Sequence, residues 1–450
     1  MMAIQGLAQT GAITEEMLEK FREGYNDDGH SKAAMNAASA NSIRNIVTDR
    51  ENLYFSDTYF THRVESSGIT DQKSTGRCWL FTGLNVLRAK IMEKHDIGEF
   101  MFSHNYNFFF DQLEKANLFL EEIIATAGRP MDDKKVEWLF KHPIGDGGQW
   151  TGVADIIEKY GVVPAEVFPE SHNSENTSMM RTLIRRKLRE NGLEIREMHE
   201  KGKDGTELRD RKEEMLNDVY RILAITLGEP PAKFSWRYKM KSGDVTEMKE
   251  YTPLSFYTEF VGVDLDDYVM FMNDPSRDYN TLYEIENDRH LHEGKNWKYI
   301  NLETGKIKEF AVQSIMDNEA MYFSCDVGKQ LDRDRGVLDI ENFDYEALFG
   351  VQFGMDKKDR IRTFESGSSH GMALVAVDLD DQGQPRKWLL ENSWGDKGFN
   401  GHLIMTDRWF DEYMFRLVVN KKHVDEQTLE ILETEPVLLP PWDPMFAPDH

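Results

Sequence analysis

Three residues that lie far apart in the sequence, Cys78, His370 and Asn392, have side chains that together could carry out acyl transfer. A thiolate can attack a carbonyl carbon, an imidazole can take and return the thiol proton, and an amide oxygen can orient the imidazole. The chain of 450 residues holds two cysteines, Cys78 and Cys325, which excludes a disulfide framework and fits a reducing compartment. These residue types indicate nucleophilic catalysis by a cysteine.

Cys78 stands at the start of a predicted helix. Apolar residues follow it at the spacing of one helix face: Leu80, Leu84, Leu87 and Ile91. A thiol at a helix N-terminus feels the positive end of the helix dipole, and a nearby imidazolium lowers its pKa further. We therefore expect the Cys78 side chain to be a thiolate near neutral pH.

His370 and Asn392 flank a predicted β-hairpin. The apolar runs MALVAV at 372–377 and KWLLEN at 387–392 are separated by the turn sequence DLDDQGQPR. In an antiparallel pair, facing residues lie symmetrically about the turn, and His370 and Asn392 are symmetric about Asp381. We expect the two side chains to meet at the open end of the hairpin, where the amide oxygen accepts the imidazole N–H.

Gln72 lies six residues before Cys78. Its side-chain NH₂ and the Cys78 backbone N–H are predicted to stabilise the oxyanion that forms in acyl transfer. A single cysteine in an apolar helix is usually a small buried hydrophobic residue, but the presence of Gln72, His370 and Asn392 favours catalysis. Cys325, in the strand-like run AMYFSCDV, is predicted to be structural.

The composition excludes several classes of protein. Apolar residues make up 40% and aromatic residues 11% of the chain, which is too much for a disordered protein. No apolar run approaches about 18 residues and the N-terminus has no signal-peptide pattern, so we expect a cytoplasmic protein that does not enter the membrane. The formal net charge of -26 argues against nucleic acid as a partner.

No sequence pattern predicts a metal or cofactor site. His290 and His292 form an H-x-H pair, but no matching Cys/His cluster accompanies it, and we expect surface histidines. The acidic run from Asp264 to Asp267 lacks the glycine and terminal glutamate of an EF-hand loop, which favours a solvated turn. We therefore expect chemistry without a bound metal ion or cofactor.

Two sequence motifs resemble those of papain-like cysteine peptidases: DQKSTGRCWLF around Cys78 and ENSWG around Asn392. Within that class, the chain is most similar to the bleomycin hydrolase and aminopeptidase C family. Further strings resemble this family in the same order: DGGQW at 146–150, NDPSRDYN at 273–280, SCDVGK at 324–329, SHGMA at 369–373 and LPPWDPM at 439–445. The resemblance runs from about residue 45 to the end of the chain.

The resemblance implies an α+β, two-lobed papain-like core, with a helical lobe, an antiparallel β-barrel-like lobe and a large helical and hook insertion. The 292 residues from Cys78 to His370 fit this placement, since about 130–150 residues separate the two in compact papain enzymes. The implied divisions are an N-terminal arm at 1–44, the helical lobe at 45–170, the insertion at 171–330, the β lobe at 331–435 and a C-terminal tail at 436–450.

The family's catalytic roles can be carried over to matching residues. The resemblance implies that Cys78 is the nucleophile and that His370 is the general base and acid. It implies that Asn392 orients the imidazole and that Gln72 is an oxyanion donor. Trp394 would shield the hydrogen bond between histidine and asparagine from water, which strengthens it.

Substrate binding is implied at two further places. Gly147 and Gly148 resemble glycines whose backbone pairs with an extended substrate, where a missing side chain permits close approach. In this family the C-terminal tail lies in the cleft, and its carboxylate holds the free amine of the substrate. His450 would carry that carboxylate here, although Phe446, Pro448, Asp449 and His450 depart from the usual family ending.

The sequence thus predicts a cytoplasmic cysteine aminopeptidase that removes residues from the free N-terminus of short peptides through a thioester. Peptides are the expected substrates, and the resemblance implies a homohexamer. One alternative is an endopeptidase on the same scaffold, which the unusual tail leaves open. Another, from a different class, is a non-catalytic assembly or nucleic-acid-binding protein that kept the fold.

Overall fold

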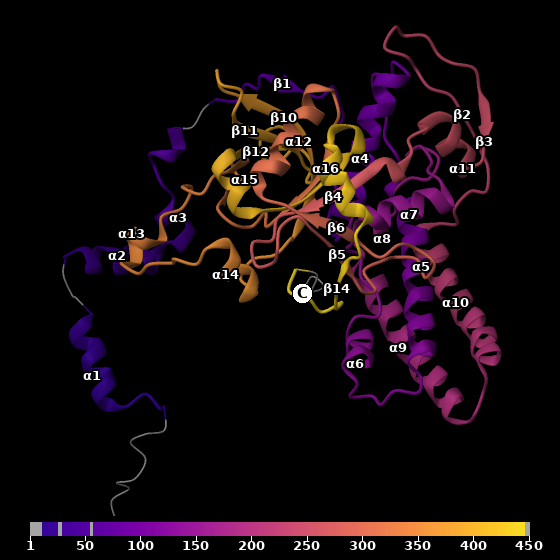
Figure 1. The fold of residues 1–450 in the computed structure, drawn as a ribbon, viewed down its shortest axis with the longest axis horizontal. Coiled ribbons are helices and arrows are strands. Elements are labelled where there is room, and N and C mark those ends of the chain that lie inside the picture. Colours follow the sequence, from indigo (N-terminus) through magenta and orange to yellow (C-terminus); the bar gives the residue numbers. More distant parts are fainter. Residues whose placement is uncertain (1–10, 26–28, 55–56, 446–450) are drawn as a thin grey trace, which may run out of the picture. The chain divides into compact units, whose positions relative to one another are not determined.

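A computed structural model of the protein describes residues 11–25, 29–54 and 57–445. The chain forms two compact units (Figure 1). The smaller unit comprises Met1–Ser56 and Glu341–Gly354, and the larger unit comprises Asp57–Ile340 and Met355–His450. Every residue predicted to take part in catalysis belongs to the larger unit.

The smaller unit is helical where it is described. Its helices are α1 (Glu15–Gly24), α2 (Gly29–Ala40), α3 (Ile43–Val47), the short η1 (Asn52–Tyr54) and α13 (Tyr345–Phe349). A bridge between Thr48 and Phe343 and a 2.9 Å hydrogen bond from Asn52 Nδ2 to Asn342 Oδ1 join its two chain segments. Residues 341–354, from the range predicted for the β lobe, therefore pack with the segment that follows α3.

The larger unit begins with a helical lobe. Figure 1 shows α5, α9 and α10 running beside one another, and all three pairs are in contact. The helices of this lobe are α4 (Cys78–Lys94), α5 (His104–Ala125), α6 (Lys134–Lys141), α7 (Trp150–Tyr160), α8 (His172–Glu175), α9 (Ser178–Glu200) and α10 (Gly205–Leu227). After α10 come β2 (Phe234–Trp236), β3 (Lys249–Tyr251), α11 (Pro253–Ser255), η2 (Phe256–Val261) and η3 (Leu265–Asp267).

Helix α4 is the central helix of this lobe. Residues 79–89 are all buried, so the helix is covered on every side and not only on the predicted apolar face. Gly83 allows α7 to approach, because a Cβ at this position would lie 2.6 Å from Val153. The N-terminal residue of α4 is therefore held by packing around the whole helix.

The second lobe is built on a 12-stranded, mainly antiparallel sheet. The strands follow the order β14 (Val437–Leu439), β5 (Thr281–Ile285), β6 (Lys298–Asn301), β4 (Tyr268–Met272), β13 (Met414–Asn420), β7 (Met321–Cys325), β10 (His370–Leu379), β11 (Pro385–Glu391), β12 (His402–Thr406), β9 (Val337–Leu338) and β8 (Leu331–Asp332), and β1 (His62–Arg63) pairs with β10. The helices of this lobe are α12 (Thr304–Met316), α14 (Lys357–Arg362), α15 (Asp407–Tyr413), η4 (Lys421–His423), α16 (Glu426–Glu430) and η5 (Ile431–Glu433). The predicted α+β class, with a helical lobe and an antiparallel β lobe, is confirmed. In the part of the chain described, β14 and β8 at the two ends of the strand order do not pair, so the sheet does not close into a barrel.

Strands β10 and β11 form the predicted hairpin, but their register differs from the prediction. Ala373 pairs with Glu391 and Leu374 with Leu390, and the register shifts between Leu374 and Ala376. Leu379 pairs with Pro385, so the turn is centred on residue 382, and the register shifts add one residue between Ala376 and Asp378. Symmetry about Asp381 therefore misplaces the pairing by two to three residues. The backbone of His370 instead pairs with Cys325 of β7.

A buried ion pair joins the helical lobe to this hairpin. Arg88 of α4 donates to Glu391 at the end of β11, and their side chains are 0% and 2% exposed. The Oγ of Ser66 donates to the same carboxylate at 3.1 Å. Because a buried charge without a partner is costly, this pair fixes α4 against the strand that leads to Asn392.

We predict that Glu391→Gln lowers the free energy of unfolding by about 3–5 kcal/mol, because it leaves the Arg88 guanidinium buried without a carboxylate. Urea denaturation followed by circular dichroism would measure the change. Glu137→Gln is the control, since its ion pair with Lys141 is exposed and water weakens such pairs. Equal stability of the two variants would contradict this role of Glu391.

Candidate active site

Cys78 is the first residue of α4, as predicted, and its side chain is partly exposed. Electrostatic interactions link it to two groups on β7: Tyr322 and Cys325. Burial raises the pKa of Cys325, and the charges of Asp326 and Cys78 raise it further. The thiol at the helix start therefore lies near the strand that pairs with His370.

The start of β10 also contacts α4 directly. A Cβ on Gly371 would lie 3.2 Å from Oγ1 of Thr82, one turn into α4, and 3.3 Å from the Tyr322 hydroxyl. A glycine after His370 therefore permits the strand to approach the helix that begins with Cys78. This packing contact is one of those that bring together residues nearly 300 positions apart in the sequence.

His370 and Asn392 meet as predicted. The His370 Nε2 atom lies 2.8 Å from Asn392 Oδ1, and the two residues are 6% and 1% exposed. Since an amide oxygen only accepts, the proton is on Nε2 and Nδ1 can accept a proton. The Trp394 ring stacks on the imidazole with centroids 4.8 Å apart, consistent with the predicted shielding.

Burial lowers the pKa of His370 to about 4, although the hydrogen bond to Asn392 opposes this shift. Removal from water disfavours the charged imidazolium. The imidazole is therefore neutral near pH 7 and can act as a general base. The start of β10, which packs on α4, thus carries a neutral base in the tautomer that can accept the thiol proton.

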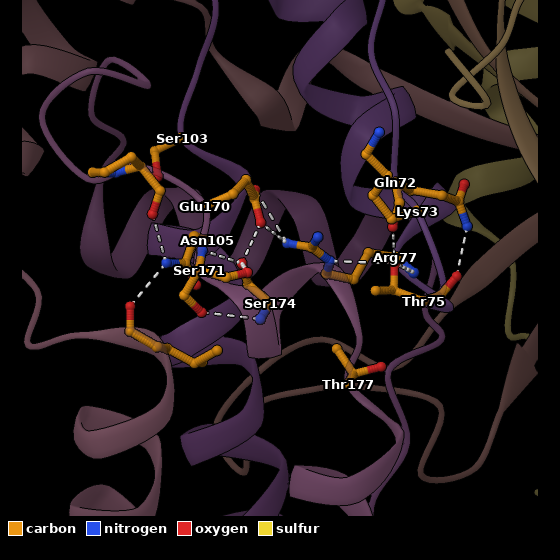
Figure 2. Close-up of polar contacts among 12 residues, drawn as sticks. Gln72, Lys73, Thr75, Arg77, Ser103, Asn105, Glu170, Ser171, Ser174 and Thr177 are labelled. Atoms are coloured by element: carbon orange, nitrogen blue, oxygen red, sulfur yellow. Dashed lines mark hydrogen bonds and ion pairs between the residues drawn. The ribbon is translucent and has the colours of Figure 1, made fainter.

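Gln72 lies in the loop before Cys78 and is bonded to the segment that carries Asn392. Its backbone N–H donates to Ser393 O at 2.9 Å, and its Oε1 accepts from Ser393 Oγ at 2.6 Å. Its Nε2 donates to Thr75 O at 2.7 Å, as Figure 2 shows. An amide NH₂ has two hydrogens, so one N–H bond beyond the contact with Thr75 can serve an oxyanion.

Gly147 and Gly148 line a cavity of about 370 Å³, together with Gly76, Ser368 and Met445. A Cβ on Gly148 would lie 2.4 Å from the imidazole of His290 and 2.8 Å from the indole of Trp79. The packing of these rings therefore already requires glycine here, in addition to the predicted approach of a substrate backbone.

His290 is the one histidine whose environment was predicted wrongly. It is buried, its Nδ1 lies 2.6 Å from Asp111 Oδ1, and its ring packs edge-on against Trp79. Burial lowers the pKa of His290, although the contact with Asp111 opposes this shift. Because Asp111 is on α5, far away in the sequence, no local pattern reveals this partner; His292 is exposed, as expected.

The acidic run at residues 264–267 forms a turn, as predicted, in which Asp264 Oδ1 accepts a hydrogen bond from Asp266 N at 3.0 Å. Its carboxylates are exposed.

A second acidic cluster could in principle bind a metal ion: within the described ranges, the ligand atoms of Asp317, Glu319 and His423 lie within 4.8 Å of one another. The Nζ of Lys422 lies 2.6 Å from each of these two carboxylates. Ion pairs account for this cluster.

The C-terminal segment is described as far as Met445, and His450 lies outside the described residues. Pro441 and Met445 line the same cavity as Gly147 and Gly148.

No helix in the described ranges is long and apolar enough to cross a membrane.

The chain is similar to known peptidases along nearly its whole length. A sequence profile of the Peptidase C1-like family matches residues 12–446. The chain is 37% identical to aminopeptidase C of Lactobacillus delbrueckii subsp. lactis, over 97% of this chain and 98% of that protein. It is 38% identical to bleomycin hydrolase of Rattus norvegicus, again over 97% and 98% of the two chains.

A solved structure supports the same relationship. The crystal structure of PepW from Lactobacillus rhamnosis HN001 superimposes with a TM-score of 0.94 at 34% identity, covering 97% of this chain and 99% of PepW. The resemblance inferred from the motifs is confirmed across almost the whole length. The chain therefore belongs to the peptidase C1-like family.

Proposed function

We propose that the protein is a cysteine aminopeptidase that hydrolyses the first peptide bond of short peptides. The observation that carries this proposal is the buried hydrogen bond between His370 and Asn392, at a strand packed against the helix that begins with Cys78. The similarity to proteins named aminopeptidase C and bleomycin hydrolase supports the same activity. A cytoplasmic location, expected from the cysteine content and composition, could be tested by cell fractionation.

In the proposed mechanism, Nδ1 of His370 takes the proton of the Cys78 thiol. The thiolate attacks the peptide carbonyl, and the oxyanion is stabilised by the Cys78 backbone N–H and the Gln72 side chain. The C–N bond breaks as the imidazolium returns its proton to the leaving amine, which leaves a thioester on Cys78. Water, deprotonated by the same imidazole, hydrolyses the thioester and restores the thiol.

The described part of the C-terminal tail supports restriction to free N-termini. Asp443 forms an ion pair with Arg277, and Arg416 donates to Met445 O at 3.0 Å. These contacts hold the tail against the cavity that Gly147 and Gly148 line. We propose that residues 446–450, ending at His450, reduce the cleft and supply the carboxylate for the substrate ammonium.

We also propose self-association, with a homohexamer as the expected state. The apolar residues of α1 and its flanks are exposed: Ile13, Met17, Leu18, Phe21 and Tyr25. Monomeric proteins seldom leave such a face uncovered, so it favours contact with other copies. Sedimentation equilibrium should give the mass of six chains, and the mass of one chain would refute this part of the proposal.

The proposed function predicts that Cys78→Ser abolishes peptide hydrolysis and that iodoacetamide inactivates the wild type, because both remove the thiolate. Release of the N-terminal residue from a fluorogenic peptide would measure this. Cys325→Ser is the control, since burial raises the pKa of that thiol and keeps it unreactive. Activity that survives in Cys78→Ser would refute the assignment of the nucleophile.

The pH dependence follows from the burial of His370. Its pKa is lowered to about 4, so the imidazole should stay neutral and active across the neutral range. We predict that kcat/KM is level between about pH 5 and 7 and falls near pH 4, where protonation of the Cys78–His370 pair removes the base. A fall centred at the ordinary histidine pKa of about 6.5 would instead show that the imidazole is solvated.

Release of the C-terminal tail should change which peptides the enzyme cleaves. Asp443→Asn should weaken the ion pair with Arg277, release the tail, and raise cleavage of N-acetylated peptides at least about tenfold relative to free peptides. Matched acetylated and free peptides would measure this ratio, with the exposed Glu435→Gln as control. If the wild type cuts both peptides equally, the endopeptidase alternative is correct.

A further inference from the structure

The nucleophile loop, residues 72–77, connects the two proposed oxyanion donors, the side chain of Gln72 and the backbone N–H of Cys78. The loop has no regular secondary structure, and Lys73 adopts a φ of 55°, which is uncommon for a residue other than glycine. Such a backbone persists only where its surroundings fix it. The contacts that fix this loop are therefore part of how the site is built.

We propose that the platform segment, residues 170–177, which includes α8 and leads into α9, positions the nucleophile loop for catalysis. Glu170 and Thr177 are the positioning residues; neither touches the reacting atoms. The inference rests on the proposed function, because it concerns the oxyanion donors of that reaction. It assigns the connection between α7 and α9 a part in catalysis.

The first connection runs through the buried Arg77. Its side chain is 0% exposed, and Nη1 donates to the Glu170 carboxylate oxygens at 3.2 and 3.0 Å (Figure 2). Its Nε donates to Thr75 Oγ1 at 3.3 Å, and that hydroxyl donates to Gln72 O at 2.7 Å. Because a buried guanidinium requires its carboxylate, Glu170 determines where this turn of the loop lies.

Glu170 is itself held in place by the first turn of α8. Ser174 Oγ donates to Glu170 Oε2 at 2.5 Å, and Ser171 N donates to Ser174 Oγ at 2.7 Å. The second contact belongs to the capping box of α8, which Figure 2 shows next to Arg77. The Glu170 side chain is 29% exposed, but this serine of the capping box holds its carboxylate toward Arg77.

The second connection runs through Asp146, which is 3% exposed. Thr177 Oγ1 donates to Asp146 Oδ2 at 2.5 Å, and the N–H of Gly76 donates to the same oxygen at 2.9 Å. Asp146 directly precedes Gly147, which lines the cavity. One carboxylate thus joins the platform segment to both the nucleophile loop and the proposed substrate backbone site.

A third connection uses backbone groups only. The N–H of Ser74 donates to Glu175 O at 3.0 Å. The platform segment therefore bonds directly to the loop at Ser74 and Arg77, and through Asp146 at Gly76. Displacement of a catalytic group by about 1 Å can lower a rate 10²-fold, so these contacts should affect the reaction of bound substrate.

The two reactions of Cys78 separate this role from a general effect on stability. Peptide hydrolysis forms an oxyanion and needs the donors at both ends of the loop. Alkylation by iodoacetamide displaces iodide from carbon and forms no oxyanion. A loop that is displaced should therefore slow hydrolysis and leave alkylation almost unchanged.

The test uses Glu170→Gln and Thr177→Val in the full-length enzyme, with Glu213→Gln and Thr182→Val as matched controls at exposed positions. We expect kcat to fall about 10–100-fold in both test variants with KM within about threefold, since supporting partners of a site have effects of this size. The alkylation rate of Cys78 should stay within about twofold of the wild type. The controls should keep the wild-type kcat.

Wild-type kcat in Thr177→Val and Glu170→Gln would overturn the proposal. So would an equal loss of hydrolysis and alkylation, which indicates disruption of the whole site. Thr177→Val leaves no buried charge without a partner, so it decides the question even if Glu170→Gln does not fold. A wild-type enzyme that alkylates at Cys78 and hydrolyses no peptide would instead refute the proposed function.

Discussion

The structure depends on one hydrogen bond kept away from water, between His370 Nε2 and Asn392 Oδ1. In water an imidazole rotates and exchanges tautomers, whereas here a buried amide oxygen fixes both its tautomer and its direction. Trp394 covers the bond, and the pairing of His370 with Cys325 fixes the backbone of the base. The sheet therefore supplies a rigid base, and the remaining task of the fold is to bring a thiol to it.

That task falls to contacts between the lobes, most of them close to the site. The N–H of Gln72 donates to Ser393 O, and the N–H of Gly395 donates to Thr70 O, so the segments before the nucleophile and after the orienting residue are hydrogen-bonded together. The buried ion pair between Arg88 of α4 and Glu391 of β11 also joins the two lobes. Removing such charges from water costs free energy. The pair serves here to fix the relative position of α4 and β11, because each buried charge needs the other as its partner.

Local sequence patterns predicted the elements that carry the site. The helix that starts at Cys78, the β10–β11 hairpin and the meeting of His370 with Asn392 all follow from apolar spacing and turn residues. The exact register did not, because the turn is centred on Gln382 and the bulge near Ala376 shifts the pairing by one more residue, and neither has a local signal. The partners of His290 and Arg77 were missed for another reason: Asp111 and Glu170 lie on distant elements, and only the folded chain brings such charges together.

If Cys78 is the nucleophile, it forms a thioester with the substrate, and this intermediate can be trapped. The enzyme would be mixed with an amino-acid p-nitrophenyl ester, quenched in acid during turnover, digested, and analysed by mass spectrometry. We expect to find the acyl group on the peptide that contains Cys78. Turnover of the ester without this adduct, or an acyl group on Cys325, would refute Cys78 as the nucleophile.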